Sequence, residues 1–413
     1  MSDATPASRH HHWGAFQHRG FLLYWIARFC ANFAVNVVSV SVGWQVYDLT
    51  KNPLDLGIIG LVQFVPALAL VLVTGSVADR FNRRLIMALC MVAEAALILG
   101  LLAFTISGSV DVRLVFLILL GLGIARAFIG PAAGSLAPNL VPPEQLGNAI
   151  AWNSSAWQFA TIVGPVAGGL LYGLAPEAPY VLAFLLVVNG VVCISFVPKP
   201  PQKILADGAS WTAVLAGFRY VWKEKIVLGA ISLDLFAVLL GGANALLPVY
   251  ARDVLEVGPW GLGLLRAAPA IGAIAVAGWL AYRPVKDHAG IILFVFVGIF
   301  GLTTIVFGIS TIAWVSVIAL AIMGASDMVS VYVRETLIQI WTPDPLRGRV
   351  NAVNMVFLGA SNELGEFRAG VSAAVFGAVA AVTFGGVGTV AIVAIWAKLF
   401  PSLLRARHLD GRV

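Results

Sequence analysis

The chain has 413 residues, of which 60% are hydrophobic and only 11% are charged. A soluble globular domain carries about 25% charged residues, so a water-soluble chain of this composition could not cover its surface with polar groups. The formal net charge of +6 is typical of membrane proteins, which keep basic residues on the cytoplasmic side. The composition therefore predicts an integral membrane protein and gives no support for a nucleic-acid partner.

Long apolar runs recur along the chain, without the short alternating segments of an outer-membrane barrel. A helix needs roughly 20 apolar residues to cross a bilayer, and it satisfies its own backbone there. We therefore predict an all-α membrane protein with twelve transmembrane helices. Their predicted centres are Val35, Val65, Ala95, Leu120, Thr161, Leu186, Leu239, Ile271, Val297, Ile322, Leu358 and Val390.

The predicted helices fall into two sets of six. We expect a tail (1–18), an N-terminal six-helix bundle (19–197), a linker (198–225), a C-terminal six-helix bundle (226–400) and a second tail (401–413). The linker opens with Pro198-Lys199-Pro200-Pro201. Apolar residues at helical spacing then predict an amphipathic helix at the membrane surface; they are Trp211, Val214, Leu215, Phe218 and Val221.

The distribution of Lys and Arg predicts the orientation. Most of the 26 basic residues lie in the two tails and in the connections that share their side, whereas Lys51, Arg113 and Arg252 lie in connections on the opposite side. By the positive-inside rule, both termini are expected in the cytoplasm. The three cysteines, Cys30, Cys90 and Cys193, lack the paired spacing of a disulfide or a metal site.

The connection between the second and third spans reads Gly75-Ser-Val-Ala-Asp79-Arg80-Phe-Asn82-Arg83-Arg84. A glycine there allows close helix approach, an acidic residue can meet a helix N-terminus or a cation across the bundle interface, and the arginines suit an anionic leaflet. The alternative is a merely basic cytoplasmic loop. The fifth span carries a second motif, Gly164-Pro165-Val-Ala-Gly168-Gly169. This motif either has a functional role or is a general seam where small residues pack helices together.

The two six-helix sets share local matches at an offset of 201 residues. At this offset Pro142 aligns with Pro343. The same offset aligns Gly147 with Gly348 and Gly169 with Gly370. A duplicated unit of this kind places a substrate site near the midplane between the halves.

Polar and ionisable residues inside the predicted spans mark a candidate wet pathway, because each costs roughly 2.5–3.5 kcal/mol to insert. The candidates for lining the substrate cavity are Arg28, Asn32, Asn36, Arg126, Asp234, Asp327 and Ser330. Ser39 and Gly43 continue the stripe of the first span, and Arg334 continues that of Asp327 and Ser330. Arg334 and Glu335 are expected to snorkel or to cap the cytoplasmic end of their helix.

Arg126 and Asp327 are equivalent at the 201-residue offset. They could pair across the interface, or each could be satisfied within its own half. Candidate proton carriers are Asp234, Asp327, Glu363 and Glu366, with Glu94 the weakest. Glu363 and Glu366 are three residues apart and face similarly, so they could titrate together or serve as a structural cap of the gate.

Three motifs carry a resemblance to a known family. The 75–84 connection resembles the G-x-x-x-D-R-x-G-R-R signature of the major facilitator superfamily, with Asn82 in place of the usual glycine. The fifth-span motif resembles the G-P-x-x-G-G core of its exporters. The eleventh span, Arg347-Gly-Arg-Val-Asn-Ala-Val-Asn354 through Gly359-Ala-Ser-Asn-Glu363-Leu-Gly-Glu366, is similar to bacterial exporters related to the enterobactin exporter. Arg368 departs from that group, where an acidic residue is expected.

The resemblance implies two pseudo-symmetric six-helix bundles, with the first, fourth, seventh and tenth helices lining a central cavity. It implies a monomeric secondary transporter in the bacterial inner membrane that exports a small amphiphilic molecule, drug-like or siderophore-like, by alternating access and proton antiport. The alternatives are an importer or lipid transporter of the same fold, or a non-transporting membrane receptor. No hydrolase, zinc-protease or Walker motif occurs, so we expect neither enzymatic activity nor a cofactor or metal.

Overall fold

The computed structural model describes residues 14–198, 211–283, 285 and 287–406. The outer parts of both predicted tails and the Lys199-Pro200-Pro201 stretch of the linker lie outside the described residues.

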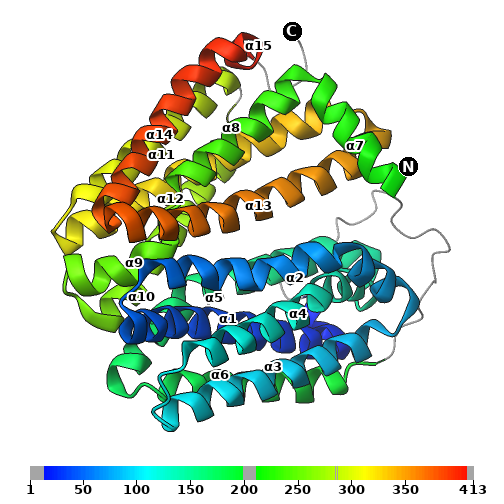
Figure 1. Ribbon diagram of the computed structural model, residues 1–413. Coiled ribbons are helices and arrows are strands. Elements are labelled where there is room, and N and C mark those ends of the chain that lie inside the picture. Colours follow the sequence, from blue (N-terminus) through cyan, green and yellow to red (C-terminus); the bar gives the residue numbers. More distant parts are fainter. Residues whose placement is uncertain (1–13, 199–210, 284, 286, 407–413) are drawn as a thin grey trace, which may run out of the picture.

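Within those ranges, a helix covers every predicted span centre (Figure 1). The helices of the first half are α1 (Arg19–Thr50), α2 (Pro53–Arg80), α3 (Arg83–Ile106), α4 (Val112–Leu136), α5 (Leu146–Leu174) and α6 (Ala178–Ser195). Those of the second half are α8 (Lys225–Gly241), α10 (Gly258–Tyr282), α11 (Ala289–Ile309), α12 (Ala313–Trp341), α13 (Asp344–Phe376) and α14 (Ala378–Leu399). Among the described residues, ten helices are apolar and long enough to cross a bilayer. The other two, α5 and α13, have 29 and 33 residues but are richer in polar side chains.

The two halves lie one above the other in Figure 1, with α2 and α13 facing each other between them. One hydrophobic cluster lies entirely in the first half, around Met87, Leu101 and Leu122. A second lies in the second half, around Leu293 and Val333. Each half therefore has its own core, as expected of a duplicated helical unit that moves as a body.

A third cluster joins the halves at one end only. It combines Val40, Tyr47 and Leu56 with residues of the second half such as Leu247 and Leu262. We call this end the far side, because it is opposite the terminal side, where α1 begins and α14 ends. The halves thus share buried apolar surface at the far side.

The seventh span is interrupted. α8 ends at Gly241, and the chain continues through short turns to Val254: η4 (Asn244–Leu246), α9 (Leu247–Val249) and the π-turn η5 (Tyr250–Val254). Gly242 leaves the helical region with φ −59° and ψ 117°, which ends α8. Pro248, which carries no backbone N–H, lies in the first turn of the short helix α9. The interruption frees backbone carbonyls inside the second half.

The glycines of the fifth-span motif allow helices to touch at their backbones. A Cβ on Gly168 would lie 2.8 Å from the carbonyl oxygen of Val37 in α1, and one on Gly164 would lie 2.6 Å from the Cβ of Asn36. A Cβ on Gly169 would overlap the carbonyl oxygen of Pro259 in α10. The motif is therefore a packing seam, and its third glycine reaches across to the other half.

The linker contains the expected helix, α7 (Trp211–Lys223). Val221 is buried against Val350 and Val353 of α13, and the Tyr220 hydroxyl donates to the Trp341 carbonyl at 2.5 Å. α7 therefore rests on the terminal side of the second half. The short helix α15 (Pro401–Leu404) also packs there, with Leu403 buried among α8 and α11 residues.

Candidate functional site

A cavity of about 410 Å³ lies between the halves. Both halves supply its wall, through α1, α2 and α4 on one side and α10, α13 and the α8–α9 connection on the other. Its lining residues are Ser39, Gly43, Leu56, Ile59, Gly60, Gln63, Phe64, Ala67, Gly123, Arg126, Ala127, Ala245, Pro248, Arg266, Glu363 and Glu366. Its volume lies within the range of small-molecule sites.

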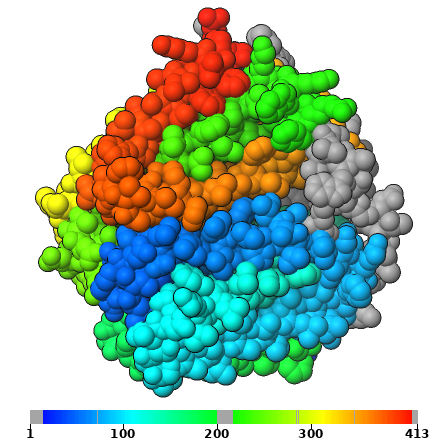
Figure 2. Space-filling model, in the orientation of Figure 1, coloured from blue at the N-terminus to red at the C-terminus, as the bar shows by residue number. Residues whose placement is uncertain are grey.

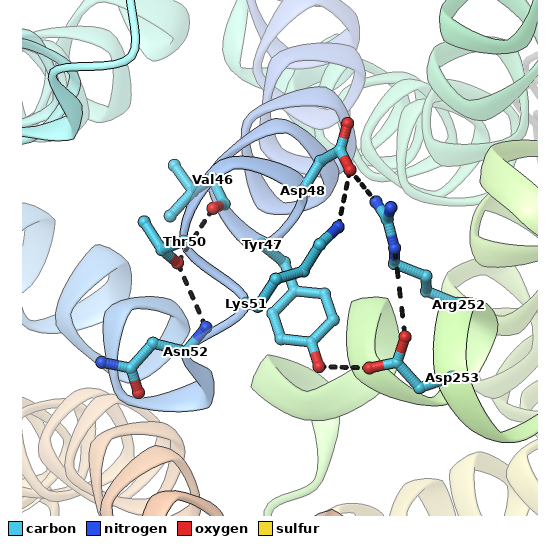
Figure 3. Close-up of polar contacts among 8 residues, drawn as sticks. All are labelled: Val46, Tyr47, Asp48, Thr50, Lys51, Asn52, Arg252 and Asp253. Atoms are coloured by element: carbon cyan, nitrogen blue, oxygen red, sulfur yellow. Dashed lines mark hydrogen bonds and ion pairs between the residues drawn. The ribbon is translucent and has the colours of Figure 1, made fainter.

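Polar contacts between the halves close the far side of this cavity (Figure 3). Asp48 of α1 forms an ion pair with Arg252 of η5, and the Tyr47 hydroxyl donates to Asp253. Lys51 also donates to Asp48 at 2.8 Å, and the Arg252 guanidinium lies 5.8 Å from the centre of the Trp44 ring. We call Tyr47, Asp48, Arg252 and Asp253 the far-side latch.

Close backbone packing adds to the closure. Gly57 of α2 faces Gly370 of α13, where a Cβ on Gly370 would lie 3.0 Å from the Cα of Gly57. A Cβ on Gly263 of α10 would lie 2.6 Å from the carbonyl oxygen of Pro165. Figure 2 shows α13 pressed directly onto the first half along this face. Little space for a solute remains between the halves at the far side.

The same four helices diverge toward the terminal side. A Cβ placed there on α2, α5, α10 or α13 would meet no atom within 4 Å; the glycines concerned are Gly75, Gly147, Gly278 and Gly348. Val73 of α2 is 50% exposed and Met355 of α13 is 66% exposed. On the terminal side the described helices of the two halves are therefore not packed against each other at these glycines.

Arg126 is satisfied within its own half. Its Nη1 donates to Gln63 Oε1 at 2.7 Å, and its Nε lies 3.5 Å from Glu94 Oε1. Glu94 is only 2% exposed, so it forms a buried counter-charge behind the cavity wall. Arg126 thus follows the second alternative and bonds within its own half, whereas Asp327 forms no ion pair within 4.0 Å in the described chain.

Arg266 was not among the candidates from the sequence. Its Nη1 donates to Ser39 Oγ at 2.5 Å and so links α10 to α1 across the interface. It also interacts electrostatically with Glu363 and Glu366. It could have been identified from its position in the middle of an apolar span, where an unpaired charge is costly.

Glu363 and Glu366 face the cavity together, as their spacing predicted. An oxygen of each lies within 3.4 Å of the position that a Cβ on Gly60 of α2 would occupy. The absence of a side chain on Gly60 gives both carboxyl groups room beside the first half. Together with Arg126 and Arg266, they give the cavity charges of both signs.

Asp234, Asp327 and Ser330 lie elsewhere. They surround a second cavity of about 10 Å³ inside the second half, with Ala237, Val238, Val297 and Phe300 as its other lining residues. The two cavities share no lining residue. The prediction that these three residues line the central cavity is therefore wrong in this conformation.

Arg334 contradicts the expectation that it snorkels to the surface. Its side chain is only 1% exposed, forms an ion pair with Asp234, and lies 3.7 Å from Glu335. Glu335 in turn accepts a hydrogen bond of 2.7 Å from Asn354 Nδ2. The network ties α8, α12 and α13 together. The buried position of Arg334 could have been inferred from the polar stripe of its helix, on which it lies seven residues after Asp327.

The polar stripe of α1 divides between two roles. Ser39 and Gly43 line the central cavity, whereas Arg28, Asn32 and Asn36 are not among its lining residues. Asn36 instead donates to the Asn32 carbonyl at 2.9 Å, beside Gly164 of α5. Asn32 and Asn36 thus belong to the α1–α5 contact.

Arg368 binds the interrupted seventh span. Its Nε donates to the Leu239 carbonyl at 2.9 Å and its Nη2 donates to the Leu240 carbonyl at 2.6 Å. These carbonyls are among those left free where α8 ends. The positive charge at this departure from the exporter group therefore has a structural role at the helix break.

The comparison with protein families decides the family of this chain. The model of the Major Facilitator Superfamily matches residues 24–366. The chain belongs to the major facilitator superfamily. It is accordingly a secondary transporter and a multi-pass membrane protein, and it is not an enzyme.

Its relatives within the superfamily are distant but full-length. An enterobactin exporter, EntS, of Citrobacter koseri is 25% identical over 411 residues, which cover 95% of this chain and 94% of that protein. The enterobactin exporter EntS of an Escherichia coli strain is 24% identical over 419 residues, 96% of this chain and 95% of that one.

Solved structures support the fold. A bacterial homologue of the lysosomal transporter Spinster, in an inward-facing and occupied conformation, matches with a TM-score of 0.73 at 16% identity, over 96% of this chain and 98% of that one. A point mutant of the nucleoside transporter NupG matches with a TM-score of 0.72 at 12% identity, over 92% and 100%. At these identities the likeness concerns the fold alone.

The superfamily's loop motif is bonded within the first half. Arg83 donates to the carbonyls of Ala78 and Ser135 at 3.1 and 2.9 Å, and its Nη2 lies 4.0 Å from Asp79. Arg84 donates to the Val197 carbonyl at 2.7 Å. The contact that Asp79 was predicted to make, with a cation of the other half or a helix N-terminus, is replaced here by Arg83.

Two further expectations for this loop are corrected. No helix approaches Gly75, because the halves are apart on this side. Asn82 has φ −64° and not a left-handed backbone, and its side chain accepts a hydrogen bond from the Arg84 N–H at the start of α3. Asn82 thus replaces the usual glycine as a helix cap.

Proposed function

We propose that this transporter exports a small amphiphilic molecule, drug-like or siderophore-like, from the bacterial cytoplasm in exchange for protons. The observation that carries the proposal is the central cavity itself. It lies between the halves, is lined by charges of both signs and apolar side chains such as Phe64, and is closed at the far side. A molecule with polar and apolar parts matches such a wall.

Alternating access follows from the arrangement of the contacts. Substrate enters from the terminal side, which the positive-inside rule assigns to the cytoplasm. The halves then rock about the bound molecule, so that the far-side latch opens while α2 and α13 close on the terminal side. Export is further supported by the distant relationship to the enterobactin exporters.

For the coupling ion, we propose that Glu363 and Glu366 exchange protons with the two sides of the membrane. They line the cavity that changes its exposure, and they lie beside Arg266, which bonds to the opposite half. Asp234 and Asp327 stay as secondary candidates, because they lie in the separate cavity of the second half.

The test uses inverted membrane vesicles, in which the cytoplasmic face points outward. Uptake of catecholate siderophores, macrolides and cationic dyes is followed with and without an acid-inside pH gradient. We expect gradient-dependent uptake of at least one compound by the unaltered protein. Replacing Glu363 by Gln should abolish the dependence on the gradient, whereas Glu177→Gln, at an exposed carboxyl outside the cavity, should leave it intact.

Three results would contradict the proposal. Uptake in right-side-out vesicles alone would indicate an importer. Binding of a compound without movement in either direction would favour a receptor. Movement of fluorescent phospholipid analogues in place of the panel would point to a lipid transporter of the same fold.

A further inference from the structure

The small cavity of the second half combines features that the proposed export mechanism does not use. Asp234 on α8 is 6% exposed and Ser330 on α12 is 3% exposed, and both line it together with Asp327. The Ser330 hydroxyl has no hydrogen-bond partner among the described residues. A buried hydroxyl in that state costs about 1–3 kcal/mol, so a buried oxygen ligand is available at this cavity.

The charges around this cavity do not cancel. Arg334 acts electrostatically on both Asp234 and Asp327, Asp234 acts on Asp327, and Glu335 acts on Asp234. With all four ionised, three carboxylates face one guanidinium. Arg334 is already engaged by Asp234 and Glu335, whereas Asp327 forms no ion pair within 4.0 Å in the described chain. An unpaired carboxylate inside a bilayer protein calls for a compensating proton or cation.

The size of the cavity restricts what can supply that charge. A volume of about 10 Å³ corresponds to roughly one water-sized particle. A dehydrated Na⁺ or Li⁺ ion is smaller than water and fits with room to spare, K⁺ is about as large as water and would just fill the cavity, and an organic cation is far larger. Ca²⁺ prefers six to eight oxygen ligands, more than the two carboxylates and one hydroxyl at this site provide.

We propose that the second half binds one Na⁺ ion between the carboxylates of Asp234 and Asp327 and the hydroxyl of Ser330. Carboxylate and hydroxyl oxygens are the ligands of hard cations. The ion links α8 to α12 next to the Arg334 network and so holds the second half together as a body. This site is independent of the direction of transport and of proton exchange at Glu363 and Glu366.

The first measurement is Na⁺ binding to the purified full-length protein in nanodiscs, with ²²Na⁺ in a scintillation proximity assay. Thermal unfolding in NaCl, KCl and choline chloride of equal ionic strength provides a second readout, because a ligand of the folded state raises the unfolding midpoint. We expect saturable ²²Na⁺ binding that excess Na⁺ or Li⁺ displaces and choline does not. The midpoint should rise in NaCl above its value in choline chloride.

A matched pair of variants tests the ligand set. Ser330→Ala should weaken Na⁺ binding about tenfold or more, since a bond to a charged group is worth about 1.5–3 kcal/mol. Ser326→Ala removes an equally buried hydroxyl from the same helix, but this hydroxyl already donates to the Ile322 carbonyl at 2.8 Å. Ser326→Ala should therefore retain binding, and Asp327→Asn should lose it.

Three outcomes would overturn the proposal. They are the absence of saturable ²²Na⁺ binding by the unaltered protein, equal midpoints in all three salts, and equal loss of binding in the two serine variants. All three are measured without transport, so they are independent of whether the vesicle experiment succeeds.

Discussion

Charged residues contribute to closing this transporter at the far side. The far-side latch joins the halves through side chains that remain partly in contact with solvent, since Arg252 is 30% and Asp48 is 44% exposed. An exposed ion pair is worth about 0.2–1 kcal/mol. The latch therefore biases the equilibrium between the two conformations without locking it.

Removing this bias has a measurable result. Asp48→Asn should raise the labelling of a cysteine at Ala127, on the cavity wall, by an impermeant maleimide added from the far side. The rise is expected to reach up to about fivefold, as about 1 kcal/mol implies. The measurement requires a protein without Cys30, Cys90 and Cys193.

Two controls accompany this measurement. Arg113→Gln, at an exposed far-side arginine outside the latch, should leave labelling unchanged. The charge reversal that combines Asp48→Arg with Arg252→Asp should restore the low value. If the double variant labels as strongly as Asp48→Asn, the ion pair is not what holds the far side closed.

At the same scale, the sequence identified part of the site. An ionisable residue in an apolar span stands out: Arg126, predicted to line the cavity, and Glu363 and Glu366, predicted as proton carriers or a cap of the gate, all line it. Their roles in transport stay predictions. Their partners could not be derived from the sequence. Whether Arg126 meets Glu94 or Asp327 depends on how helices of one half pack, and an internal offset aligns positions without placing side chains.

At the scale of helices, backbone contact at glycines controls closure. Gly169→Ala should disrupt the α5–α10 contact, because the new Cβ would overlap the Pro259 carbonyl oxygen, a backbone atom that cannot rotate away. We expect far-side labelling of the Ala127 cysteine to increase and transport to fall several-fold. Gly173→Ala on the same helix places its Cβ in open space and should have little effect. Equal behaviour of the two variants would show that helix propensity, and not contact between the halves, is responsible.

The number and order of helices followed from the sequence, but the break in the seventh span did not. Its signals were present in Gly241, Gly242 and Pro248. The apolar run from Lys225 to Val254 is long enough for an unbroken span, which hid them. The role of Arg368 could not be predicted either. It donates to the Leu239 and Leu240 carbonyls, which are free only because that helix ends early.

At the scale of the whole molecule, the direction of transport depends on which side of the membrane carries the termini. We expect a green fluorescent protein fused after Val413 to fluoresce and an alkaline phosphatase fused there to be inactive, since both report a cytoplasmic location. Phosphatase fused within the connection between α3 and α4 should be active. The reverse pattern would invert the orientation, and the open side of the cavity would then face away from the cytoplasm.

Because the far-side latch is partly exposed, its strength depends on the ionic strength of the solution on that side. Ions screen exposed charges over about 8 Å at physiological ionic strength and over about 3 Å in 1 M salt. The buried pair of Arg334 and Asp234 is shielded from this effect, with side chains 1% and 8% exposed. Salinity on the far side therefore shifts how often the molecule opens in that direction while leaving each half intact. With the termini in the cytoplasm, as proposed, the far side faces outward, and the salt concentration outside then sets the resting conformation of the transporter in part.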